Sequence, residues 1–189
     1  MQIIEEKSRR EALIDAASHL FRSKGYERTS VRDLAQAVGM QSGSLFYHFR
    51  SKAEILEAVM AQGVGDITEN ARQALQHVQG PKQRLSTLMQ VHLAALLGSS
   101  QNALEVLLYE WDSLEPDARE RIVRLRDEYE KIWQQVLDEA AQAGLIPDDT
   151  TLLRKMLFGS LNWTVQWFRP SGNLSIEQLA DRMLRLIMR

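Results

Sequence analysis

Cysteine is absent from the 189-residue chain, and proline occurs only four times. Without cysteine, the chain cannot form disulfides, thiolate nucleophiles or cysteine-ligated zinc sites. No run of about eighteen apolar residues is present that could span a bilayer. The first twelve residues, MQIIEEKSRREA, lack the apolar core of a secretory signal. With 44% hydrophobic and 25% charged residues, we expect a globular cytoplasmic protein without a membrane partner.

The motifs that mark common enzymes are also missing. The sequence contains no His-Glu-x-x-His, and no histidine follows a glutamate by three residues, so the zinc-protease and di-iron bundle patterns are absent. Gly63-Val64-Gly65 has no third glycine and no preceding strand, and no Gly-x-Ser-x-Gly occurs. We therefore expect no catalytic residues, no metal ion and no cofactor.

Charge is unevenly distributed along the chain. The formal net charge is −2, which by itself argues against a nucleic-acid partner. Residues 1–55, however, hold nine Lys or Arg against seven Asp or Glu, and the remainder holds fourteen against eighteen. The modest positive excess therefore lies at the N-terminal end.

Helical spacing of apolar residues, interrupted by glycine and proline, predicts an all-α fold. Ser8 and Glu11 fit a capping box that begins the first helix, and Gly25 ends it. Three helices are expected within residues 8–50, the last two joined by a glycine turn at Gly39, which is helix-turn-helix geometry. Longer helices are expected over 51–77, 82–98, 101–113, 116–143, 149–168 and 175–188.

The stretch from Gly39 to Lys52, GMQSGSLFYHFRSK, is small and polar at its start, aromatic in the middle and basic at its end. Leu45, Phe46 and Phe49 are expected to anchor its helix to the first two helices. Gly43 costs helix stability, about 1 kcal/mol against alanine, but allows close backbone approach to another surface. Side chains on the exposed side can donate hydrogen bonds to phosphate, and they are Tyr47, His48 and Lys52. The alternative is that Tyr47 and His48 are ordinary surface residues beside a small core.

The ordered framework LF…GY…TSVRDLA…VGM…GSLFYHFRSK resembles the N-terminal DNA-binding domain of the tetracycline-repressor (TetR) family. The resemblance covers about the first sixty residues. It implies a DNA-binding domain over residues 1–50, a helical ligand-binding and dimerisation domain over 51–189, and a homodimer on a double-stranded DNA operator. By the same resemblance, the residues that face DNA are Ser30, Arg32, Gln41, Ser42, Gly43, Ser44, Tyr47, His48 and Lys52.

Two positions depart from the family pattern. Phe46 stands where many members carry tyrosine, so a hydroxyl contact is lost. Gln41 stands where serine is common, and glutamine is a poor N-cap. The phosphate contacts of Tyr47, His48 and Lys52 are therefore better defined by the sequence than the contacts with bases.

The last two expected helices are assigned to the dimer face. The segment from Met156 to Phe168 is nearly apolar all round, as in a helix that is buried on both sides. One side can face its own subunit and the other its twin, in a four-helix bundle between subunits. The interface is predicted to contain Leu161, Thr164, Trp167, Phe168, Leu179, Met183 and Leu186.

The C-terminal half is also similar to the TetR branch that regulates fatty-acid and acyl-CoA catabolism, through YEWDSLEPDARERIVRLRDEYEKIW and LFGSLNWTVQWFRPSGNLSIEQLAD. This resemblance implies a small hydrophobic effector, an acyl-CoA, that releases a repressor from its operator. His92 and Asn162 lie among apolar neighbours and can orient a ligand carbonyl, although a histidine that serves only the core is the alternative. The pocket is predicted to contain His92, Leu107, Trp111, Tyr129, Trp133, Phe158, Asn162 and Trp163. Two alternatives remain open. The effector can be another hydrophobic ligand, such as a drug or aromatic compound, or the protein can bind DNA without any effector.

Overall fold

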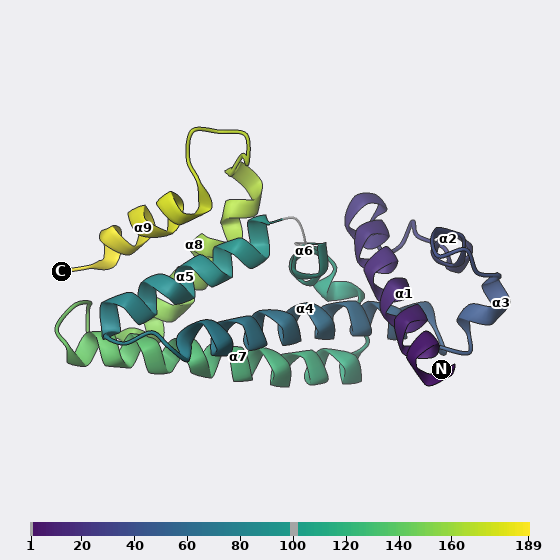
Figure 1. Cartoon of the computed structure of the whole chain (residues 1–189), viewed down its shortest axis with the longest axis horizontal. Helices are drawn as coiled ribbons and strands as arrows, with labels where there is room; N and C mark the ends of the chain where they lie inside the picture. Colours follow the sequence, from purple (N-terminus) through teal and green to yellow (C-terminus); the bar gives the residue numbers. More distant parts are fainter. Residues whose placement is uncertain (1, 99–101) are drawn as a thin grey trace. The chain divides into compact units, whose positions relative to one another are not determined.

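The computed structural model describes residues 2–98 and 102–189, with side chains from residue 9 onward. The described residues form helices and connecting turns without a strand, as predicted (Figure 1). The elements are α1 Gln2–Lys24, α2 Val31–Ala37, α3 Ser42–Leu45, α4 Lys52–Leu75, α5 Pro81–Leu97, α6 Asn102–Tyr109, the 3-10 turn η1 Trp111–Ser113, α7 Pro116–Gln142, α8 Thr150–Trp167 and α9 Ile176–Ile187.

The helix ends follow the local signals of the sequence. Ser30 caps α2 in a capping box with Asp33, and Ser175 caps α9 in the same way with Gln178. Gly25 and Gly39, which follow α1 and α2, have positive φ angles of 85° and 67°. Glycine adopts these angles without the steric cost that a side chain would bring.

One predicted helix start is wrong. α1 begins at Gln2, six residues before the predicted N-cap Ser8. The upstream stretch Glu5-Glu6-Lys7 consists of good helix formers, and no glycine or proline interrupts it. The capping side chain of Ser8 itself, and the predicted break at Ser99-Ser100, lie outside what the structure describes.

The first of two compact units combines residues 1–64 with residues 102–124. Its core contains Leu13 and Phe21 of α1, Leu34 of α2, and Leu45 of α3, all at most 1% exposed. The later segment, which includes α6, η1 and the start of α7, completes this core with Val106, Leu114, Ala118 and Ile122. The unit that holds the helix-turn-helix therefore extends beyond residues 1–50, the DNA-binding boundary expected from the family.

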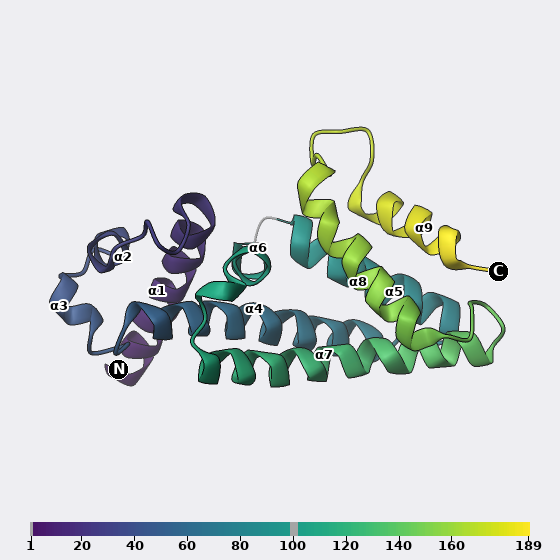
Figure 2. The ribbon, with the colours of Figure 1, turned by 180° about the vertical axis from the view of Figure 1, so that it is seen from behind.

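The second unit combines residues 65–101 with residues 125–189. Within it, α5 packs against both α8 and α9, and α5 and α8 lie side by side in both views (Figures 1 and 2). The largest of its fully buried side chains is Trp133 of α7, and Leu88 of α5 and Leu161 of α8 are also fully buried. None of the described helices combines the length and low charge that a bilayer span requires.

Candidate functional site

The turn between α2 and α3 is held by backbone and capping bonds. The amide of Met40 donates to the carbonyl oxygen of Ala35 over 2.8 Å, closing the turn at Gly39. At the other end of α2, the Ser30 amide donates to Asp33 and the Asp33 amide donates back to the Ser30 hydroxyl. The backbone bond from Ser30 holds the pKa of Asp33 below its ordinary value. The negative charge that caps α2 therefore persists at neutral pH.

Beside this turn, α2 and α3 expose a shallow groove. Arg32 and Gln41 are both exposed. Gln41 is the N-cap of α3 but makes no capping bond with its side chain, so its amide is available to a partner. The groove measures about 460 Å³ and is lined by Arg32, Gln36, Gly39, Met40, Gln41 and Ser42. A guanidinium and two amides in one groove match the groups that bind base edges and phosphates.

Gly43 has no structural need to be glycine. A Cβ built at this position meets nothing within 4 Å, and its φ is not positive. The chain could therefore carry alanine here and gain helix propensity. The empty space over Gly43 is consistent with the prediction that another molecule approaches this backbone closely.

Two of the three predicted anchors hold α3 in place, and the third does not. Leu45 and Phe49 are 0% and 1% exposed, whereas Phe46 is 53% exposed. Leu45 and Phe49 are four residues apart and share the inward face, but Phe46 is rotated by about 100° from Leu45 along the helical turn. The anchoring prediction for Phe46 is wrong, and its ring lies at the surface beside Tyr47, which is 87% exposed.

Lys52 has a partner within the chain. Its ammonium group donates to the carbonyl oxygen of Tyr26 over 2.9 Å and lies 4.1 Å from the centre of the Tyr26 ring. The contact ties the start of α4 to the loop after α1. An ammonium has three donors, so the bond to Tyr26 leaves room for a phosphate. His48 and Ser44 are partly exposed, and the predicted contacts of all three residues with DNA stay predictions.

Three polar contacts join α6, η1 and α7 to the rest of this unit. Arg22 of α1 donates to Glu105 of α6 over 2.6 Å, and the Tyr26 amide donates to Glu110 over 3.0 Å. Arg121 of α7 forms a two-pronged ion pair with Glu57 of α4, at 2.5 and 2.7 Å. The Arg121 bond lowers the pKa of Glu57, so the pair is charged at neutral pH.

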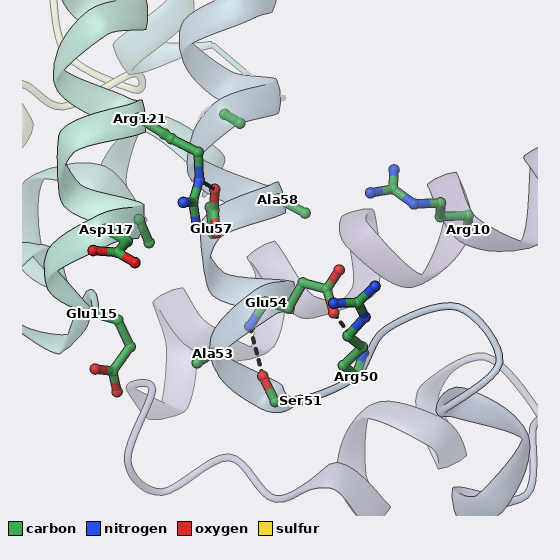
Figure 3. Close-up of a pocket in the computed structure, with 12 residues that line it drawn as sticks. Arg10, Arg50, Ser51, Ala53, Glu54, Glu57, Ala58, Glu115, Asp117 and Arg121 are labelled. Carbon is green, nitrogen blue, oxygen red and sulfur yellow. Dashed lines mark hydrogen bonds and ion pairs between the residues drawn. The ribbon is translucent and has the colours of Figure 1, made fainter.

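The Arg121–Glu57 pair borders a groove of about 650 Å³ between α1, α4 and α7. Figure 3 shows the guanidinium of Arg121 on Glu57. It also shows the Glu54 carboxylate accepting from the Arg50 amide and the Glu54 amide donating to the Ser51 hydroxyl. Four carboxylates and three guanidinium groups line this groove. The mixed charge does not favour an anion, and the groove is best described as a polar seam within the unit.

In the second unit, a polar cluster is buried among aromatic rings. The Nδ1 atom of His92 lies 3.0 Å from the Tyr129 hydroxyl, and its Nε2 atom lies 3.0 Å from Oδ1 of Asn162. The ring of Phe158 lies 5.4 Å from the rings of both His92 and Trp133. The structure thus brings together five of the eight residues that the sequence assigned to a pocket.

The other three predicted pocket residues lie elsewhere. Leu107 and Trp111 pack against the core of the first unit, because α6 and η1 belong to that unit. Trp163 is 65% exposed, since it follows Asn162 by one residue and therefore projects from a different side of α8. The residues that line an effector site stay a prediction, now centred on the cluster.

The predicted dimer face is only partly exposed. Leu161, Thr164 and Leu179 are at most 4% exposed within the single chain, so they are corrected to core residues. Phe168 and Met183 are partly exposed, whereas Trp167 is 50% and Leu186 85% exposed. The sequence analysis did not predict the exposed Leu152 and Met156. The available signal was their helical spacing, with four residues from Leu152 to Met156 and seven from Met156 to Trp163. The exposed apolar stripe of α8 contains Leu152, Met156, Trp163 and Trp167.

Among the described residues, no group of three or more His, Asp or Glu side chains could hold a metal ion. Two protein families match the chain. "Bacterial regulatory proteins, tetR family" matches residues 13–59, and "Tetracyclin repressor-like, C-terminal domain" matches residues 78–189. The first match contains α2, the turn and α3, and the second contains the His92 cluster and α9.

Several known proteins match nearly the whole chain. The transcriptional repressor KstR2 of Mycolicibacterium smegmatis is 28% identical over 186 residues, which cover 96% of this chain and 89% of that protein. The crystal structure of the superantigen PfiT is 46% identical with a TM-score of 0.86, over 96% of this chain and 97% of that one. AibR in complex with isovaleryl coenzyme A and operator DNA is 28% identical with a TM-score of 0.86, over 95% and 97% of the two chains. The chain described above belongs to the TetR family and is a helix-turn-helix transcriptional repressor.

Proposed function

We propose that this repressor is a cytoplasmic homodimer that leaves a palindromic operator when a small hydrophobic effector, an acyl-CoA, binds in its second unit. The observation that carries the effector is the His92–Tyr129–Asn162 cluster. Polar side chains are costly to bury unless they are hydrogen-bonded, and a core of leucine would be cheaper. The cluster supports a role beyond filling the core.

The DNA contacts are proposed for the groove and the exposed face of α3. Gln41, Ser42 and Ser44 reach base edges, and the backbone at Gly43 approaches the groove of the DNA. Arg32 reaches a phosphate or a base edge. Ser30, Tyr47, His48 and Lys52 hold phosphates. Exposed donors of this kind position a protein on DNA and read its sequence.

The dimer is proposed to form through the apolar stripe of α8, with a second copy of this chain as the occupant. Four large apolar side chains at a helical repeat, each at least half exposed, form a patch that soluble monomers rarely carry. An isologous pair of such faces buries the stripe against itself. The partly exposed Met183 and the exposed Leu186 of α9 are proposed to border it.

Release from the operator is proposed to depend on the spacing of the two recognition helices in the dimer. Two recognition helices must lie about one helical turn of DNA apart to bind both half-sites. A ligand changes this spacing only by binding one arrangement of the dimer more tightly than the other. α4 and α7 each contribute residues to both compact units, which makes them the covalent route between effector and DNA.

The acyl-CoA class is supported by AibR, which has the same fold and is described in complex with isovaleryl coenzyme A and operator DNA. Burial lowers the pKa of His92 to about 4, so the cluster is neutral at physiological pH. A neutral cluster suits a carbonyl group better than a cationic drug. A different hydrophobic ligand, or no effector at all, is the alternative.

The test is displacement of operator DNA. The operator is selected from random duplexes with the purified protein, and binding is followed by fluorescence anisotropy while isovaleryl-, octanoyl- or longer-chain acyl-CoA is added. We expect release by one chain-length class and a matching thermal shift, since a ligand at a hundredfold excess over its Kd adds about 2.7 kcal/mol of stability. Free CoA is the control. Release by aromatic drugs alone, or by no compound, would support the respective alternative.

A further inference from the structure

The buried polar cluster is a directed chain of hydrogen bonds from α7 through α5 to α8. Tyr129 is 6% exposed and His92 is 4% exposed, whereas Asn162 is partly exposed. The chain runs Tyr129 hydroxyl, His92 Nδ1, His92 Nε2, Asn162 Oδ1, with both contacts at 3.0 Å. Only its Asn162 end is therefore open to a second molecule.

The donors and acceptors of this chain are fixed by chemistry. The Oδ1 atom of Asn162 can only accept, so His92 carries its proton on Nε2 and donates to it. The Nδ1 atom of the neutral ring is then an acceptor, and the Tyr129 hydroxyl donates to it. Burial lowers the pKa of His92 to about 4 and raises the pKa of Tyr129, so the ring stays neutral and the hydroxyl keeps its proton.

This arrangement leaves donors without acceptors. The NH2 group of Asn162 has two N–H donors, and within the described part of the chain none of them meets an acceptor. The indole N–H of Trp133, which is 0% exposed, lies beside the Tyr129 hydroxyl but meets no acceptor with hydrogen-bond geometry. The cluster as a whole thus has an excess of donors.

An excess of donors selects ligands that bring an acceptor. We infer that the NH2 group of Asn162 binds a carbonyl oxygen of the effector, the thioester oxygen in an acyl-CoA, with His92 and Tyr129 as positioning residues. The inference rests on the proposed effector function. The Oδ1 atom is held by His92, which fixes the rotation of the amide and presents its N–H groups outward. Phe158, 5.4 Å from the His92 ring, provides apolar contact for the acyl chain.

The experiment uses pairs of ligands whose two members differ only at the carbonyl. Isovaleryl-CoA and octanoyl-CoA are each measured against the thioether in which CH2 replaces C=O, by calorimetry and by operator release. A donor that loses its acceptor in a desolvated site weakens binding, and we expect the wild-type protein to bind the thioesters about tenfold more tightly. In Asn162→Leu the ratio should fall to about one.

Asn162→Asp keeps the acceptor for His92 but replaces the donors, and it should lose the thioester preference while retaining the fold. Asn173→Leu, at an exposed site after α8, is the matched control and should keep the wild-type ratio. Equal wild-type binding of thioester and thioether would overturn the inference and leave the proposed effector class intact. A preference that persists in both Asn162 variants would also overturn it. If neither CoA compound binds the wild-type protein, the proposed effector fails, and the inference fails with it.

Discussion

Replacing Gly43 by alanine should stabilise the fold and weaken operator binding, two effects of opposite sign from one methyl group. A Cβ at this position meets no atom of the chain within 4 Å. Alanine is favoured over glycine within helices by roughly 0.5–1 kcal/mol. Because α3 is a single turn, we expect a gain of about 0.5 kcal/mol in the free energy of unfolding.

The same methyl group would occupy the space in which DNA approaches. If it displaces one well-made base contact, the cost is about 1–3 kcal/mol. Since about 1.4 kcal/mol corresponds to a tenfold change in affinity, the operator Kd should rise roughly fivefold to a hundredfold.

Both quantities can be measured on one protein preparation. Urea denaturation gives the free energy of unfolding, and anisotropy of a labelled operator duplex at fixed salt gives the Kd. Gly65→Ala is the matched control, because Gly65 is exposed within α4 and its Cβ would also meet nothing within 4 Å. The control should be stabilised without losing affinity. If Gly43→Ala bound the operator as tightly as the wild type, the reasoning that DNA approaches this backbone would be refuted.

Three further predictions concern ionisation, phosphate contacts and assembly. In the folded protein the pKa of His92 is about 4, below the ordinary value of 6.5. The stability that the neutral, buried ring contributes to the fold is therefore fully present above pH 6.5 and is lost as the pH falls towards 4. Urea melts should therefore show about 2 kcal/mol of stability lost by the wild type between pH 7 and pH 5 that His92→Gln does not lose; parallel curves would contradict this. Lys52→Ala should weaken binding to operator and unrelated DNA alike, and should lower the slope of log affinity against log salt concentration by about one unit. An unchanged slope would mean that Lys52 contacts Tyr26 but no phosphate. Trp163→Glu should convert the dimer to monomer in sedimentation experiments, whereas Val123→Glu, at an exposed apolar site on α7, should not; a dimer that persists in Trp163→Glu would place the interface elsewhere.

Much of the fold could be predicted because the residues that start and end its helices act locally. Prolines at the start of α5 and α7, capping serines before α2 and α9, and glycines after α1 and α2 mark helix ends by backbone chemistry alone. α1 was predicted too short because a capping box inside a run of helix formers does not force a start. Local rules therefore gave most boundaries to within a few residues.

Orientation was harder to predict. In α8 the segment from Met156 to Phe168 is apolar all round, so periodicity does not say which side faces inward. Leu161 and Thr164 face inward, while Trp163 and Trp167 face outward. His92 and Asn162 could each be singled out because both are polar among apolar neighbours, but their hydrogen bond to each other was not predicted. The place of Leu107 and Trp111 was not predicted either, because membership of a core depends on contacts distant in sequence.

The composition of the first core has a consequence for how the protein is made. Val106, Leu114, Ala118 and Ile122 belong to the same buried cluster as Leu13 and Phe49. During translation, the core of the DNA-binding unit cannot be completed until the segment that ends at Ile122 has been synthesised. A fragment that ends at residue 64 would leave apolar surface of α1 and α4 open to water, together with Arg22 deprived of Glu105. We therefore expect a fragment of the DNA-binding end alone to be less stable than the same residues in the whole chain, and fusion proteins or binding assays should use the whole chain.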